Sequence, residues 1–156
     1  MFYIYKVSVN SSKTLNEIYN NLMINTETNV SVKMWTTIHL YKLVEHKYFY
    51  GSVSKNRFKI QKIINYRNSF LPVIYGKFCK KDDGIQVKIS MRLNRFTLLF
   101  LALWYFIILY FLSLFSKFNY QMLYVLLFGL IPFLFIIFGF YPEAKKASYK
   151  LNTILK

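Results

Sequence analysis

The chain has 156 residues, of which 55% are hydrophobic and 21% aromatic, and its formal net charge is +15. Soluble basic proteins such as nucleic-acid binders are rarely this apolar, so the composition favours a membrane protein with a basic side. The single cysteine excludes an internal disulfide, and with it a disulfide-stapled secreted module. Asn, Lys, Ile, Phe and Tyr are abundant, which is typical of an AT-rich genome and which we interpret as that of a low-GC bacterium.

Residues 1–95 have the pattern of a small, basic α+β domain. Alternating side chains over residues 2–9 predict a strand, and Thr14 with Glu17 forms a capping box that predicts the start of a helix. Further segments alternate apolar and polar residues and meet at turn sequences such as Asp83-Gly84. We therefore expect an N-terminal helix with an antiparallel β-meander in this domain.

The stretch INYRNSFLPVIYGKF, residues 64–78, interrupts this strand pattern with a polar break. One interpretation is structural: Asn68 and Ser69 supply the hydrogen bonds of a bulged corner between two strands. The other is functional: Arg67 offers a planar fork to a phosphate or carboxylate, with Asn68, Ser69 and Lys77 as further contacts. Lipid head groups of the inner leaflet would be the natural anions for such a site.

Two long uncharged runs follow, one of 20 residues over 96–115 and one of 24 residues over 118–141. A helix of about 20 residues is about 30 Å long, which is the hydrocarbon thickness of a bilayer. The sequence therefore predicts a transmembrane helical hairpin over residues 96–141. Neither run contains a charged residue or a histidine, so we interpret the hairpin as an anchor and not as an ion pathway.

Basic residues lie at both outer ends of the hairpin, whereas its tip contains only Lys117. The positive-inside rule therefore predicts a two-span protein of the plasma membrane with both termini in the cytoplasm. Residues 142–156 have the pattern of a cytoplasmic amphipathic helix. We expect the apolar stripe of this helix to pack back on the sheet, because an open antiparallel sheet needs one face covered.

One motif in the chain is distinctive. It comprises Gly51, Phe58, Ile60, Tyr66, Arg67, Asn68, Ser69, Phe70, Pro72, Val73, Gly76 and Lys77, followed by Arg92, Leu93, Arg95 and Phe96. With this YRNSFxPVxxGK pattern, residues 48–141 resemble a group of small uncharacterised two-helix membrane proteins of low-GC Gram-positive bacteria. The resemblance implies an integral membrane protein with a cytoplasmic α+β domain, and it implies no activity.

The sequence contains few residue patterns that are typical of catalytic sites. His39 and His46 are seven residues apart, Cys79 has no paired histidine or acid, and the sequence contains no Gly-rich phosphate loop and no metal-ligand spacing. We therefore expect no enzyme and no cofactor or metal. Nucleic acid is not an expected partner either, because the aromatic residues alternate as in a core and do not form a basic stripe.

The expected function is that of a non-enzymatic, membrane-anchored binding or interaction module on the cytoplasmic face. Its expected partners are anionic lipids of the inner leaflet, with another membrane protein as a further candidate. The alternative is a membrane immunity or accessory protein that acts on another membrane protein through its hairpin. The sequence leaves the oligomeric state open.

Overall fold

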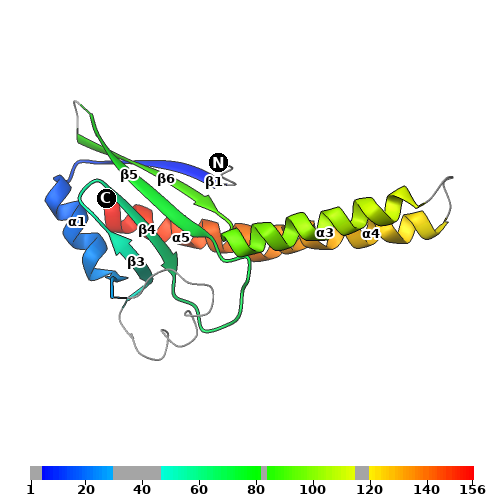
Figure 1. The fold of residues 1–156 in the computed structure, drawn as a ribbon. Coiled ribbons are helices and arrows are strands. Elements are labelled where there is room, and N and C mark those ends of the chain that lie inside the picture. Colours follow the sequence, from blue (N-terminus) through cyan, green and yellow to red (C-terminus); the bar gives the residue numbers. More distant parts are fainter. Residues whose placement is uncertain (1–4, 30–46, 82–83, 115–119) are drawn as a thin grey trace.

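The computed structural model describes residues 5–29, 47–81, 84–114 and 120–156. The elements in chain order are β1 (Tyr5–Ser11), α1 (Leu15–Ile24), β2 (Thr26–Glu27), β3 (Phe49–Val53), β4 (Arg57–Lys62), β5 (Val73–Lys81), β6 (Gly84–Arg92), α3 (Arg95–Ser113), α4 (Tyr120–Phe135), the π-helical turn η1 (Ile136–Phe140) and α5 (Tyr141–Leu155). Figure 1 shows a head, in which the strands lie beside α1 and α5, and a helical hairpin of α3 and α4 that projects from one end of it. The fold is α+β, as the sequence predicts. His39 and His46 lie outside the described residues.

The six strands form one sheet in the order β1-β6-β5-β4-β3-β2. Strands β3 to β6 make the predicted antiparallel meander, and β1 joins it by antiparallel pairing with β6. Strand β2 differs from the expected pattern, because it pairs in parallel with β3. Parallel pairing needs a long connection between the two strands, and residues 28–48 provide one.

Helix α1 begins at the predicted capping box. The Thr14 hydroxyl accepts a hydrogen bond from the Glu17 backbone N–H at 3.3 Å, and the Glu17 carboxylate accepts one from the Thr14 N–H at 2.7 Å. These bonds satisfy two N–H groups that the first helical turn leaves without partners. The helix buries Ile18 and Leu22 completely against the sheet core.

Helix α5 covers the same face of the sheet, so the prediction that the C-terminal helix packs back on it is confirmed. The residues of α5 that are completely buried are Ala144, Ala147, Leu151 and Leu155. Its end is fixed by the strand and helix beside it: the Ser11 hydroxyl donates to the Leu155 carbonyl, and the Asn21 amide donates to the Ile154 carbonyl. Each fully buried leucine contributes about 2 kcal/mol of apolar burial.

The centre of the sheet depends on a glycine in β5. Phe58 of β4 lies directly opposite Gly76, and its ring occupies the space that a side chain at Gly76 would need. A Cβ at Gly76 would lie 2.0 Å from the Phe58 ring. The aromatic ring therefore covers the glycine, and the pair fills the core face at this position.

Helix α3 and the continuous helix Tyr120–Leu155, which begins with α4, are both long and apolar enough to cross a membrane, with mean hydropathy values of 2.2 and 2.6. They pack along each other through a few contacts, among them the stacked rings of Trp104 and Phe128, whose centroids are 4.6 Å apart. Their remaining surface is exposed, and only 17% of each apolar window is buried. Phe106 of α3 is 69% exposed, and Phe133 of α4 is 55% exposed.

The second helix of the hairpin does not end where the head begins. A continuous helix of 36 residues runs from Tyr120 to Leu155 through α4, η1 and α5. Within η1 the hydrogen bond runs from the Tyr141 N–H to the Ile136 carbonyl, one residue wider than in an α-helix. Pro142, which has no N–H to donate, follows this wide turn directly. The helix therefore has no break at the predicted boundary between residues 141 and 142.

Candidate functional site

The polar break lies in the loop between β4 and β5, where residues 66–70 pack against the base of the hairpin. We call these five residues the corner. The Asn68 amide donates to the Gly139 carbonyl of η1 at 2.8 Å, and its carbonyl oxygen accepts from the Phe70 N–H at 2.9 Å. The Thr97 hydroxyl of α3 donates to the Ser69 carbonyl at 2.7 Å. The corner therefore makes hydrogen bonds to both helices of the hairpin where they leave the head.

The corner also packs closely against α4 and η1. The Phe70 ring lies against Phe135 of α4, with ring centroids 5.6 Å apart. A side chain at Gly139 would bring a Cβ to 3.2 Å from the Phe70 Cβ and to 3.3 Å from the Asn68 amide oxygen. Such contacts are tighter than ordinary van der Waals distances, so the absence of a side chain at Gly139 allows the corner its close approach.

The structure brings three of the four predicted site residues together and separates the fourth. Asn68 makes a local hydrogen bond with the Phe70 N–H, of the kind that the structural interpretation expects, whereas the bonds of Asn68 and of the Ser69 backbone carbonyl to the hairpin were not predicted. Arg67 is exposed, and within the described part of the chain its side chain has no hydrogen bond or ion pair. Lys77 lies on β5 and lines a hollow on the other face of the sheet, to which the corner does not contribute.

A buried ion-pair cluster lies beside the corner, at the first turn of α5. Glu143 is 4% exposed, and its carboxylate accepts from the Lys62 ammonium at 2.8 Å and from the Lys146 ammonium at 2.9 Å. Burial alone would raise the pKa of Glu143, but hydrogen bonds from Lys62, Lys146 and Tyr66 outweigh it and lower the pKa. Burial, together with the hydrogen bond to Glu143, raises the pKa of Tyr66 to about 12. The cluster joins β4, the corner and α5.

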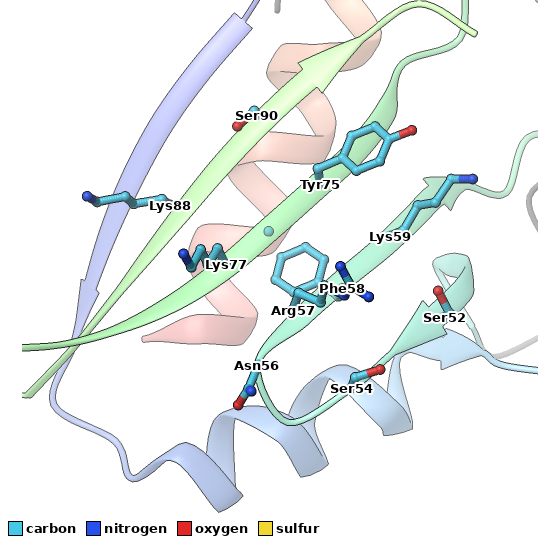
Figure 2. Close-up of a pocket in the computed structure, with 11 residues that line it drawn as sticks. Ser52, Ser54, Asn56, Arg57, Phe58, Lys59, Tyr75, Lys77, Lys88 and Ser90 are labelled. Carbon is cyan, nitrogen blue, oxygen red and sulfur yellow. The ribbon is translucent and has the colours of Figure 1, made fainter. Parts of the chain in front are cut away.

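The outer face of the sheet, opposite α1 and α5, is a second candidate surface. Side chains that alternate with the core residues point to this face, and Figure 2 shows those on β4, β5 and β6 around a hollow of about 730 Å³. The residues that line it are Ser52, Ser54, Asn56, Arg57, Phe58, Lys59, Tyr75, Gly76, Lys77, Lys88 and Ser90. Lys77 is the residue of this surface that the sequence singled out.

Two parts of these surfaces escaped sequence reasoning. Lys62 and Glu143 are 81 residues apart in the sequence, so nothing local indicated their ion pair. The cations of the outer face come from three strands whose register cannot be read from charge alone. The only available signal was the alternation within each strand, which separates the polar face from the apolar one.

Groupings that suggest a metal centre are lacking among the described residues, since no three His, Cys, Asp or Glu side chains lie together there. Comparison of the chain with protein-family models, with curated proteins and with solved structures finds no match.

Proposed function

We propose that the protein is an integral membrane protein whose hairpin, α3 and α4, anchors a non-enzymatic binding module at the cytoplasmic face of the plasma membrane. The observation that carries the proposal is the exposure of both apolar helices, because only 17% of each apolar window is buried. The core helix of a soluble protein has its apolar side chains buried by the rest of the chain. In a bilayer, lipid solvates them, and the helix satisfies its own backbone hydrogen bonds.

The charge distribution supports the orientation. The basic residues that flank the hairpin include Arg92 at the end of β6, Arg95 at the start of α3 and Lys145 in α5. A cytoplasmic head follows from the positive-inside rule, and anionic lipid of the inner leaflet attracts each such cation by about 1 kcal/mol.

The position of the corner supports a proposal for which part of the protein lies at the membrane surface. The corner contacts α3 at Thr97 and η1 at Gly139, and exposed apolar surface begins at the same height, with Phe96 at 66% exposure. In the proposed orientation this height is the head-group region. The exposed guanidinium of Arg67 would then meet lipid phosphates there, and the corner would hold the head at a defined depth.

Cysteine labelling in intact cells tests the orientation. In a Cys79→Ser background, a membrane-impermeant thiol reagent should label Lys117→Cys from outside and should label Ser12→Cys and Lys150→Cys only after the membrane is opened. The reverse pattern would refute a cytoplasmic head.

Crosslinking in native membranes tests the binding role. Partners should be captured by a variant in which the hairpin is replaced by an unrelated two-helix anchor, since the head carries the binding surfaces. Capture that is lost with this replacement, and retained when the head surfaces are altered, would instead support a protein that acts on another membrane protein through its hairpin.

A further inference from the structure

The outer face of the sheet carries a row of cations that the strand register aligns. Arg57 of β4 pairs directly with Lys77 of β5, and Lys77 pairs directly with Lys88 of β6. Partners in an antiparallel pair have Cα atoms about 5 Å apart, and their side chains point to the same face. Lys59 lies in the next row of the same face, opposite Tyr75. We call Arg57, Lys59, Lys77 and Lys88 the outer cation cluster.

This arrangement is unfavourable for the isolated chain, because like charges placed directly opposite on neighbouring strands destabilise a sheet. The described carboxylates do not relieve it. Glu17 is used in the capping box, Glu27 pairs with Lys47, and Glu143 pairs with Lys62 and Lys146. Within the described part of the chain, no carboxylate makes an ion pair with the outer cation cluster. An anion from outside the chain would compensate these charges.

The hollow above the cluster limits the size and chemistry of this anion. Its volume of about 730 Å³ falls within the usual range for small-molecule sites. The lining is mixed: the hydroxyls of Ser52, Ser54 and Ser90 and the amide of Asn56 can form hydrogen bonds, and Phe58 and Tyr75 add aromatic surface. Arginine grips a phosphate with two parallel bonds and lysine adds point charges, so this lining fits clustered phosphate groups.

Two features disfavour a polymer as the ligand. Strands β4, β5 and β6 are each paired on both sides, so an acidic peptide could not add to them by backbone pairing. Single-stranded nucleic acid is held by bases stacked on aromatic rings. The described aromatic residues of the lining are already engaged: Phe58 is 2% exposed, and the Tyr75 ring lies 4.4 Å from the Arg92 guanidinium.

The distance of most of the cluster from the hairpin disfavours lipid head groups of the protein's own membrane as its ligand. Lys88 lies four residues before Arg92, which is about 13 Å along the strand from the end that leads into α3. The Debye length is about 10 Å at 0.1 M salt, so attraction of the row of Arg57, Lys77 and Lys88 to the bilayer surface is weakened, and only Lys59 lies one row nearer to α3. A soluble ligand is therefore favoured.

From these observations, we infer that the outer cation cluster binds a small soluble anion with two or three linked phosphate groups. The inference rests on the proposed function, because it names the ligand class of the anchored head. It requires no chemical step, since the cluster has only to hold and neutralise the anion.

The test uses the full-length protein in neutral detergent, titrated calorimetrically with inorganic tripolyphosphate and with orthophosphate. Tripolyphosphate should bind at least about tenfold more tightly, since it engages several cations at once. Lys77→Gln removes the central cation and should weaken tripolyphosphate binding by about tenfold or more. The matched control Lys145→Gln removes the same charge from the exposed face of α5 and should leave binding unchanged.

A thermal melt separates lost binding from lost folding. Because Lys77→Gln relieves like-charge repulsion, its melting temperature without ligand should equal or exceed that of the wild type. Tripolyphosphate that binds wild type and Lys77→Gln equally, or that fails to bind the wild type, would overturn the inference. Tighter binding of polyglutamate or of a single-stranded oligonucleotide than of tripolyphosphate would overturn the ligand class. Cysteine labelling, which does not depend on this ligand, would show separately whether the membrane anchor and its orientation stand.

Discussion

Replacing Glu143 by glutamine should destabilise the head strongly, because it leaves a buried lysine without its counterion. The side chains of Glu143 and Lys62 are 5% and 13% exposed, and their charged atoms are 2.8 Å apart. Removing one partner of a buried pair typically costs 3–5 kcal/mol. Glutamine still offers an acceptor, and Lys62 keeps its position 5.5 Å from the Tyr48 ring, so we expect about 3 kcal/mol. For a chain of this size that corresponds to a drop in melting temperature of about 9 °C.

The pH dependence of the stability of the head provides a second test of this prediction. The pKa of Glu143 is lowered from its ordinary value of 4.5, so the folded state favours the charged carboxylate. The stabilisation by this group is therefore complete above about pH 4.5 and is lost as the pH falls through the lowered pKa of the folded protein. Thermal melts of wild type and Glu143→Gln in detergent should differ most at neutral pH and converge in acid.

Two further variants serve as controls for the pair. Lys146 contacts the same carboxylate, but its side chain is 60% exposed, so Lys146→Gln should change the melting temperature little. The double variant Lys62→Met with Glu143→Gln removes the stranded charge and should recover much of the lost stability. A single Glu143→Gln variant that melts within experimental error of the wild type at neutral pH would refute the reasoning.

The corner yields two more predictions. Asn68→Ala leaves the Gly139 carbonyl and the Phe70 N–H without their partner and should cost about 2 kcal/mol, measurable as a lower melting temperature and faster proteolysis of the loop in detergent; an unchanged melt would mean that water replaces the amide. Arg67→Ala should leave the melt in neutral detergent unchanged, but should reduce the extra stability that anionic lipid gives the protein in nanodiscs, with Arg67→Lys in between; equal lipid effects in all three proteins would argue against a head-group contact.

The helices and the meander were predictable because their signals are local. Run length identified the two apolar helices, the spacing of Thr14 and Glu17 identified the start of α1, and alternation identified the two faces of β6. The turn between β5 and β6 was also predictable. Gly84 has a φ of +134° there, and a Cβ at this position would lie 2.6 Å from the Ser11 carbonyl oxygen, so a residue with a side chain would be strained.

The candidate sites were less predictable because they depend on relations between distant segments. The polar break read from residues 64–78 had two interpretations, and only the contacts of Asn68 and Ser69 with the hairpin show what these two residues do in the fold. The row of Arg57, Lys77 and Lys88 exists only in one strand register. A shift of a single residue would send one of these side chains to the core face, so the charges alone could not have revealed the row.

The way the hairpin joins the head bears on how a bound ligand would be presented. Strand β6 leads into α3 after only Leu93 and Asn94, and α4 continues into α5 through η1 without a loop (Figure 1). The corner and the Glu143 cluster then tie this junction to β4 from the side. Neither connection is a flexible linker, so the head cannot swing freely about the hairpin. If α3 and α4 are fixed in a bilayer, a ligand on the outer cation cluster is held at a set height and orientation above it. A surface fixed in this way suits recognition of a ligand or partner that arrives at the membrane, whereas a module on a long tether would search a volume instead.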